Sequence, residues 1–257
     1  MDRKEFTDSL SILLRECSDA VGGPYYSNAT QMDGLLFRIA YVFQKNATII
    51  DLGGGLSPVN GVLAMLGMNV IVYDLLSVYW DDRFHTSAQN QSLFKILQKC
   101  GVRFIEKNLD QLDLTESYPH NSADIIVSHH CIEHFHNSPK ALLESAIKVV
   151  KPDGRLIIEV PNAANALKRL RLLFGHTNYP SYKEYYESDK YYGHVREYTT
   201  EDLKSLAQYL RQSDFKLFGT NYLGLDKIPS SLRGIVDSIL RTRPGLCASI
   251  YLDITKH

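Results

Sequence analysis

The sequence is poor in cysteine, and it lacks a long apolar run and an excess of either charge. Its four cysteines, at 17, 100, 131 and 247, form no Cys-x-x-Cys pair, so neither a zinc knuckle nor a disulfide framework is expected. No apolar stretch has the length of a membrane span, and the charged start of the chain, residues 1–5, is unlike a secretory signal peptide. The net charge of -1 gives no general attraction to nucleic acid. We therefore expect a cytoplasmic protein without a membrane span or a nucleic-acid partner.

The length of 257 residues, with 44% hydrophobic and 22% charged residues, suits one domain around one large core. Continuous runs rich in Ile and Val, typical of strands covered on both faces, occur near 48–52, 69–74, 102–106, 123–128 and 155–160. Helical periodicity near 88–99 and 138–150 separates some of these runs. Alternating strands and helices predict a parallel sheet.

A glycine turn follows the first of these runs, in the segment Asp51-Leu52-Gly53-Gly54-Gly55. Glycines at 53 and 55 allow the backbone and a ligand to approach where any Cβ atom would collide. The second run ends at Asp74, and an acid that closes the second strand of a βαβ unit suits the two hydroxyls of a ribose. The two features together predict a nucleoside-binding site.

Two residues near the turn indicate which nucleoside cofactor binds. A dinucleotide site requires a third glycine where this chain has Pro58, although Ser57 and Pro58 still suit the start of a helix over about 58–66. Asp51 would repel a pyrophosphate, but it suits the ammonium group of an amino acid. A cofactor with an amino acid at one end and an adenosine at the other fits both observations, and S-adenosylmethionine is such a molecule.

On these residues the chain resembles the class I S-adenosylmethionine-dependent methyltransferases. The resemblance continues through 102–108, 123–135 and 151–162, which are similar to the family's third to fifth strands. It implies a three-layer, Rossmann-like α/β sandwich whose seven-stranded sheet is mostly parallel with an antiparallel edge strand. Two closing strands are expected near 215–219 and 248–254, after a helix that begins at the capping pair Thr199 and Asp202 and runs to about 212.

We expect four parts within the single domain. Residues 1–45 are expected to form a helical N-terminal cap, 46–162 the cofactor-binding core, 163–198 a substrate or lid insert, and 199–257 the C-terminal helix and closing strands. The cofactor contacts that it implies are Asp51, Gly53, Gly54, Gly55, Asp74, Leu75, Asn108, Leu109 and Ser128. Trp80 is a further candidate, for stacking near the adenine.

Histidines follow the fourth strand in Ser128-His129-His130-Cys131-Ile132-Glu133-His134, on the side where ligands of such sheets bind. The catalytic candidates are His130, His129 and His194, and we favour a general base without a divalent metal. The alternative is a metal on His130, Glu133, His134 and His194, because one helical turn over 130–134 would put the first three on one face. This spacing is similar to the Glu-x-x-Glu-His of ubiquinone-biosynthesis O-methyltransferases and of metal-dependent small-RNA 2′-O-methyltransferases. A purely structural cluster is the third interpretation.

The insert is rich in tyrosine, at 179, 182, 185, 186, 191, 192 and 198, which either form a binding wall or pack the insert onto the core. Near its start, Lys168, Arg169 and Arg171 alternate with leucines and indicate a short amphipathic helix. We expect these leucines to face the core; contact with a phosphate, a sugar nucleotide or a membrane surface is the alternative.

The function that follows is transfer of a methyl group from S-adenosylmethionine, with S-adenosylhomocysteine as product, to an oxygen, less readily a nitrogen, of a small molecule or glycan. The segment 194–198 resembles one found in methyltransferases of bacterial glycan and natural-product pathways. Two alternatives stay open: a non-catalytic S-adenosylmethionine-binding regulatory or assembly module, and a nicotinamide-dependent oxidoreductase. The sequence does not indicate an oligomeric state.

Overall fold

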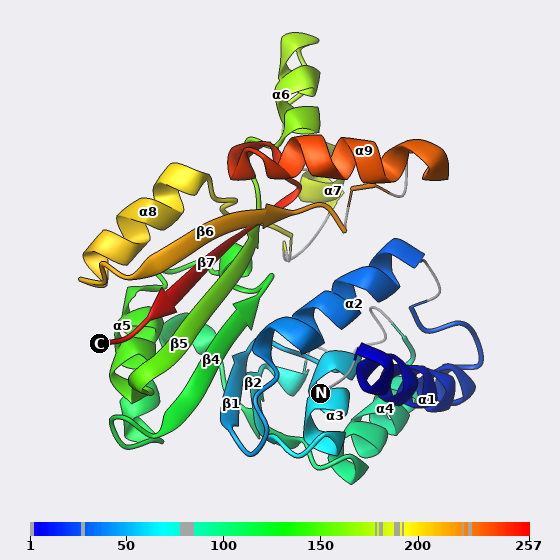
Figure 1. Cartoon of the computed structure of the whole chain (residues 1–257), viewed down its shortest axis with the longest axis vertical. Coiled ribbons are helices and arrows are strands. Elements are labelled where there is room, and N and C mark those ends of the chain that lie inside the picture. Colours follow the sequence, from blue (N-terminus) through cyan, green and yellow to red (C-terminus); the bar gives the residue numbers. More distant parts are fainter. Residues whose placement is uncertain are drawn as a thin grey trace.

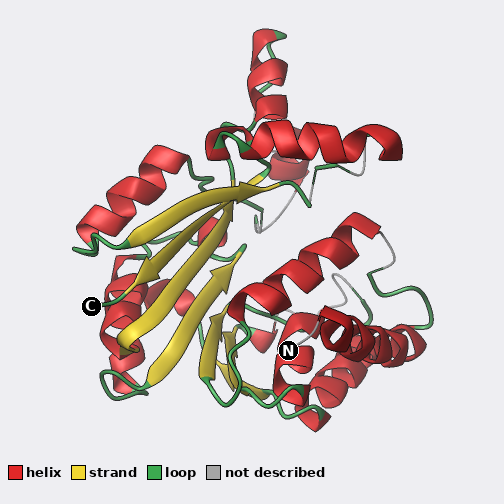
Figure 2. Ribbon diagram, in the orientation of Figure 1, coloured by secondary structure: helices red, strands yellow, loops and turns green. Residues whose placement is uncertain are grey.

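A computed structural model of the chain describes residues 3–26, 29–77, 85–177, 179, 182–187, 191, 193–222, 224–225 and 228–257. The described residues form a seven-stranded sheet with the order β3-β2-β1-β4-β5-β7-β6 (Figures 1 and 2). The strands are β1 (Thr48–Leu52), β2 (Asn69–Asp74), β3 (Arg103–Glu106), β4 (Ala123–His129), β5 (Val150–Pro161), β6 (Phe215–Thr220) and β7 (Ser249–Thr255). β1 to β5 pair in parallel, whereas β7 is antiparallel to both of its neighbours.

Helices cover both faces of this sheet. Those described are α1 (Arg3–Val21), α2 (Ala29–Val42), α3 (Pro58–Met65), α4 (Ser87–Lys99), α5 (Lys140–Val149), α6 (Ala166–Leu173), α7 (Tyr182–Glu187), α8 (Thr200–Tyr209) and α9 (Ser230–Arg241). α1 to α4 lie on one side, α5 and α8 on the other, and α6 and α9 at the end of the sheet where the parallel strands finish (Figure 1). Within the described part of the chain, no helix has the length and apolar character that crossing a bilayer requires.

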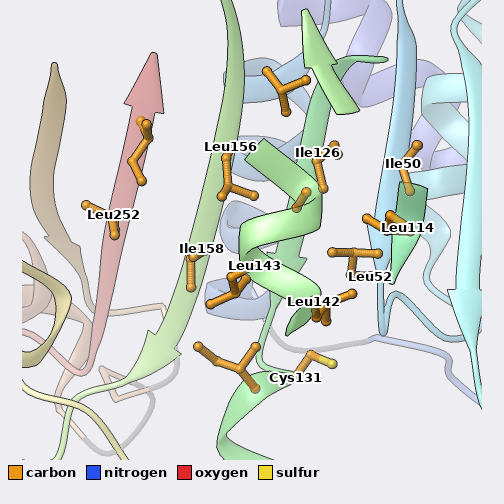
Figure 3. Packing of buried hydrophobic residues seen from close by; sticks show 14 of the residues in the cluster. Ile50, Leu52, Leu114, Ile126, Cys131, Leu142, Leu143, Leu156, Ile158 and Leu252 are labelled. Atoms are coloured by element: carbon orange, nitrogen blue, oxygen red, sulfur yellow. The ribbon is translucent and has the colours of Figure 1, made fainter. Parts of the chain in front are cut away.

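Adjacent residues of a strand pack into two different hydrophobic clusters, one on each face of the sheet, because side chains alternate between the faces. Ile49 packs into the cluster under α1 to α4, and Ile50 into the cluster under α5 and α8. In the second cluster, Leu142 and Leu143 of α5 lie against strand residues such as Leu156 (Figure 3). Burial on both faces explains why the strands read as continuous apolar runs.

The predicted architecture is confirmed, with differences in detail. The antiparallel strand β7 lies one position inside the edge, which β6 forms. β5 begins at Val150 rather than near 155, and its first part pairs with β4 across a register shift that contains Asp153, whose φ is 63°. The capping box of Thr199 and Asp202 is present, and Pro58 opens α3 behind the Ser57 cap. The helix α9 was not among the predicted elements.

One expectation about the insert is wrong. The leucines of α6 do not face the core, because no residue of this helix is buried. Leu173 is 80% exposed and Phe174, just beyond the helix, is 73% exposed. The helix projects from the body of the molecule instead of packing on the sheet (Figure 1).

Candidate active site

The glycine turn after β1 is packed too tightly for side chains. Gly53 and Gly55 have φ angles of 78° and 54°, in the left-handed region that favours glycine. A Cβ atom at Gly53 would lie 2.2 Å from the Cys131 Sγ atom, and one at Gly54 would lie 2.0 Å from an oxygen of Asp51. The turn therefore holds β1, the loop after β4 and the Asp51 carboxylate in close contact, and it leaves its own backbone open to a ligand.

Asp51 is buried beneath this turn. Its Oδ2 atom accepts a 2.7 Å hydrogen bond from the Asn60 side chain, whereas its Oδ1 atom has no hydrogen-bond partner among the described residues. Burial raises the pKa of Asp51 to about 7, although the Asn60 hydrogen bond opposes the shift. A buried carboxylate oxygen without a donor suits a cationic group on the ligand, such as the ammonium of an amino acid.

Asp74, at the end of β2, faces back toward the turn. Its two oxygens accept hydrogen bonds from the Gly55 N–H, at 2.8 Å, and from the Leu75 N–H, at 2.7 Å. Carboxylate oxygens accept more than one hydrogen bond, so these contacts fix the group and still allow it to bind hydroxyls. The Leu75 side chain itself is 36% exposed.

The remaining predicted cofactor residues lie at neighbouring strand ends. Ser128 is fully buried near the end of β4, and Leu109 is buried beside Gly53. Asn108 is exposed, and its side-chain oxygen accepts a hydrogen bond from the Asp110 N–H at the start of the short 3-10 helix η2 (Leu109–Gln111). The structure thus brings the predicted set to the carboxyl ends of β1 to β4.

A cavity of about 440 Å³ lies against the glycine turn, a size typical of cofactor pockets. The N-terminal segment forms its other wall, because Tyr25 and Tyr26 line it and the Tyr25 hydroxyl donates a 3.0 Å hydrogen bond to the Leu56 carbonyl. His85 and Asn90 also line it. Trp80, a predicted adenine contact, lies outside the described residues.

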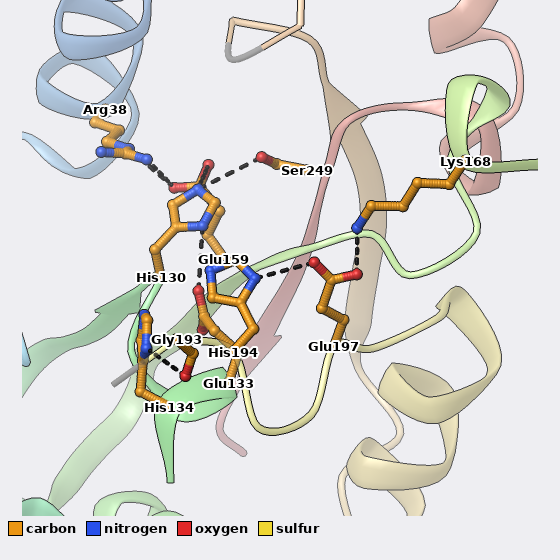
Figure 4. Close-up of polar contacts among 10 residues, drawn as sticks. All are labelled: Arg38, His130, Glu133, His134, Glu159, Lys168, Gly193, His194, Glu197 and Ser249. Atoms are coloured by element: carbon orange, nitrogen blue, oxygen red, sulfur yellow. Dashed lines mark hydrogen bonds and ion pairs between the residues drawn. The ribbon is translucent and has the colours of Figure 1, made fainter. Parts of the chain in front are cut away.

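The histidine loop after β4 differs from the predicted helical turn. Its 3-10 turn η4 covers only Ile132–His134, and His130 precedes it with a φ of 51°. His130 Nε2 lies 3.1 Å from Glu159 Oε1, and its Nδ1 lies 3.4 Å from Glu133 Oε1 (Figure 4). On its other side Glu159 forms an ion pair of 2.8 Å with Arg38 of α2.

These neighbours determine the charge of the histidine. Burial alone would lower the pKa of His130, but Glu159 and Glu133 raise it to about 9. Burial would likewise raise the pKa of Glu159, but Arg38 and His130 hold it well below its ordinary value. At neutral pH, His130 is therefore an imidazolium between two carboxylates.

His129 has the opposite environment. Its Nε2 atom is buried and has no hydrogen-bond partner among the described residues, and its ring lies near that of Tyr251. Burial, together with the charge of Arg38, lowers the pKa of His129 to about 3. This imidazole is neutral over the physiological range.

His194 lies in the insert, opposite the histidine loop. Its Nδ1 atom is 3.0 Å from Glu197 Oε1, and the other Glu197 oxygen is bound to Lys168 (Figure 4). Burial would raise the pKa of Glu197, but His194 and Lys168 lower it, so this carboxylate stays charged. In the neutral form of the imidazole, a charged carboxylate at Nδ1 would hold the ring proton there and leave Nε2 to accept a proton.

Three of the four predicted metal ligands also meet here. One ligand atom from each of Glu133, His134 and His194 lies within 4.8 Å of the others. Glu133 is fully buried; apart from the 3.4 Å ion pair of its Oε1 atom with His130 Nδ1, neither oxygen has a hydrogen-bond partner in the described part of the chain. His134 Nδ1 contacts the Gly193 carbonyl at 3.2 Å. The set has donors that suit a divalent ion, whereas His130 is engaged with Glu159.

The insert encloses a second cavity of about 560 Å³. Tyr179 and Tyr191 line it together with residues 193–197 and Leu172 of α6. Tyr198 is buried in the core, while the remaining described tyrosines, Tyr182, Tyr185 and Tyr186, are exposed. Tyr192 lies outside the described residues. Packing onto the core is thus seen for Tyr198, and a binding wall of Tyr179 and Tyr191 stays a prediction.

Sequence reasoning missed Arg38, Glu159 and the pairing of Glu197. Arg38 and Glu159 are 121 positions apart, so no local pattern indicates their contact. Glu159 did give a signal, since an acid inside the apolar run of β5 requires a charged partner.

Comparison with known proteins identifies the family. The family model described as a methyltransferase domain matches residues 27–217. The chain belongs to the methyltransferase family. None of the curated protein sequences compared with this methyltransferase matches it.

Solved structures show the same fold. An S-adenosylmethionine-dependent methyltransferase of Thermotoga maritima is 15% identical with a TM-score of 0.55, over 86% of this chain and 87% of its own. One from Archaeoglobus fulgidus is 14% identical with a TM-score of 0.54, over 93% and 97%. Phosphoethanolamine N-methyltransferase 2 of Haemonchus contortus, in complex with S-adenosyl-L-methionine, is 15% identical with a TM-score of 0.53, over 97% of this chain and 56% of its own. The prediction of a class I S-adenosylmethionine-dependent methyltransferase is confirmed.

Proposed function

We propose that this methyltransferase transfers the methyl group to an oxygen atom of a small molecule or glycan. Asp74 would hold the ribose of the cofactor, and Asp51 its ammonium group. The adenine would lie by Leu75, Asn108 and Leu109. When bound, the cofactor supplies a methyl group that its sulfonium already activates, so the protein has to orient the acceptor and remove its proton.

The observation that carries the oxygen acceptor is the His194 and Glu197 pair in the wall of the insert cavity. A hydroxyl acceptor needs a base, and an imidazole oriented by a carboxylate is a common one. His130 already carries a proton at neutral pH, and His129 is too weak a base to hold one. We therefore favour His194 as the base, with the 163–198 insert as the acceptor wall.

A nitrogen acceptor is the second candidate. The buried Glu133 carboxylate, whose Oε1 atom lies 3.4 Å from His130 Nδ1 and whose Oε2 atom has no hydrogen-bond donor among the described residues, would suit an acceptor that arrives as an ammonium. Two of the similar solved structures are of one enzyme, phosphoethanolamine N-methyltransferase 2 of Haemonchus contortus.

Transfer of a labelled methyl group to panels of phenols, sugars and amines tests the proposal. We expect transfer to hydroxyl compounds, and a fall of roughly 10²–10⁴-fold in His194→Gln. Glu197→Gln should show a smaller fall, because it disturbs only the orientation of His194. His176→Gln is the matched control, since His176 is an exposed histidine of the same insert.

The other outcomes are distinct. Loss of activity on chelation, restored by Mn²⁺ or Zn²⁺ and accompanied by loss of the ion in Glu133→Gln, His134→Gln and His194→Gln, would establish the metal alternative. Full activity in all of these variants and in His130→Gln would make the cluster structural. Cofactor binding without transfer to any acceptor would favour the binding module.

A further inference from the structure

The helices α6 and α9 expose apolar side chains that no described part of the chain covers. On α6 and the residue after it, Leu167, Leu170, Leu173 and Phe174 recur at helical spacing and are 51–80% exposed. On α9, Leu232, Ile235 and Ile239 form a second stripe with exposures of 49–61%. Exposed apolar side chains in such contiguous groups mark interaction sites.

The two helices belong to one surface. The Arg169 guanidinium of α6 donates a 3.1 Å hydrogen bond to the Gly245 carbonyl, in the turn that follows α9. α9 lies across the end of the sheet, and α6 projects beyond it (Figure 1). We call this surface, residues 163–177 and 228–248, the basic apolar face.

Its charge contrasts with that of the rest of the molecule. The face contains six basic residues, Lys168, Arg169, Arg171, Arg233, Arg241 and Arg243, and one acid, Asp237. The net charge of these two ranges is +5, so the remainder of the chain, whose total is -1, carries -6; Lys168 is paired with Glu197 outside the ranges, and Arg241 with Asp237 within them. Arg169, Arg171 and Arg243 are exposed and have no acidic partner among the described residues. The arginines flank the leucines of α6 at adjacent helical positions.

We propose that the basic apolar face docks on an anionic lipid bilayer. Apolar side chains would enter the interface, and the flanking arginines would contact the negative headgroups, as in interfacial amphipathic helices. A second copy of the chain is a poorer occupant, because two faces of charge +5 repel each other. Leu172 of α6 lines the insert cavity, so docking would place one wall of the proposed acceptor site near the membrane.

Cosedimentation of the full chain with vesicles tests this. The vesicles are phosphatidylcholine alone and phosphatidylcholine mixed with an equal part of phosphatidylglycerol. We expect binding to the anionic vesicles, weakened by salt, and a loss of at least about tenfold in the double variants Leu173→Asp/Phe174→Asp and Arg171→Glu/Arg243→Glu. The matched controls are Ile12→Asp, which changes an exposed apolar residue of α1, and Lys95→Glu/Lys99→Glu on α4; both should bind as the parent does.

Circular dichroism shows whether each variant is folded. Calorimetric titration with S-adenosylhomocysteine shows whether its cofactor site is intact, independently of vesicle binding by the basic apolar face. Absence of binding to anionic vesicles overturns the proposal, as does binding that the face variants leave intact. Concentration-dependent self-association that the same variants abolish, without vesicle binding, assigns the face to a second copy. Binding of an acidic protein to the basic apolar face, without binding to vesicles, also overturns the proposal of membrane docking.

Discussion

His130 keeps its proton in a position where burial alone would remove it. Its left-handed backbone costs about 1–2 kcal/mol for a residue with a Cβ atom, and this conformation aims the ring between Glu159 and Glu133. Arg38 of the N-terminal cap shares Glu159, so the charged group joins α2, β5 and the histidine loop. We interpret His130 as a positioning residue that fixes the loop beside the glycine turn.

The stability of the protein should therefore depend on pH above neutrality. The folded pKa of about 9 exceeds the ordinary value of 6.5, so the stabilisation is complete below pH 6.5 and is lost as the pH rises through 9. Asp51, with its pKa of about 7, titrates mostly below this window. Between about pH 7 and pH 9.5 we expect the free energy of unfolding to fall, by at most about 3 kcal/mol.

Urea unfolding at several pH values measures this slope. His130→Gln should be less stable at neutral pH and should show a much flatter profile. His176→Gln, in which an exposed histidine is replaced, should keep the slope of the parent. An equal slope in His130→Gln and the parent would assign the pH dependence to other groups.

Among the elements, α5 illustrates how local sequence determines packing. Its apolar residues recur with helical period, and Ala146 is buried in the same cluster as Leu142 and Leu143. The two leucines lie against the sheet (Figure 3). Leu143→Ala should lower the free energy of unfolding by about 2–5 kcal/mol, because it leaves a cavity in a filled core. The matched control is Leu173→Ala on α6, where the same side chain is 80% exposed and the change should stay within about 0.5 kcal/mol.

Denaturant unfolding of both variants gives the comparison. A large loss in Leu173→Ala would mean that α6 packs against the protein in solution. It would also remove the exposed leucines on which the proposed membrane docking rests.

The elements that could be predicted are those whose side chains follow a local period. β1, β2 and α5 carry such a pattern, and the caps Ser57 and Thr199 were read from adjacent residues. α6 has the same period, but a period does not reveal what lies opposite the apolar face. For that reason the sequence predicts that the leucines of α6 face the core, whereas the structure exposes them.

The residues of the candidate site also fall into a group that the sequence predicts and a group that only the fold brings together. Asp51, the glycines and Asp74 lie close in sequence to the strands that position them, so the motif located them. The Arg38–Glu159 ion pair and the Glu197 partner of His194 join distant segments, and only the fold brings them together. The charge of His130 depends on these distant partners, which explains why the sequence left its role open.

At the scale of the whole molecule, cofactor binding should stabilise the fold, because the site joins the N-terminal cap, the glycine turn and the strand ends. At a concentration about 100 times the dissociation constant, S-adenosylhomocysteine should raise the free energy of unfolding by about 2.7 kcal/mol. A nicotinamide dinucleotide at the same concentration should give no comparable shift, because Pro58 and Asp51 disfavour a pyrophosphate. Thermal unfolding with each ligand measures the difference.

Asp74→Ala connects this stabilisation to the ribose. The variant should fold, since Asp74 is at the rim of the site. It should lose more than about 1.5 kcal/mol of binding free energy for S-adenosylhomocysteine, because the substitution removes a charged hydrogen-bond acceptor. Asp19→Ala, which removes an exposed acid of α1, is the matched control and should bind as the parent does. Calorimetric titration of the three proteins with S-adenosylhomocysteine decides the matter. Equal affinity in all three would remove Asp74 from the cofactor site, and a stronger response to the dinucleotide would contradict the assigned cofactor.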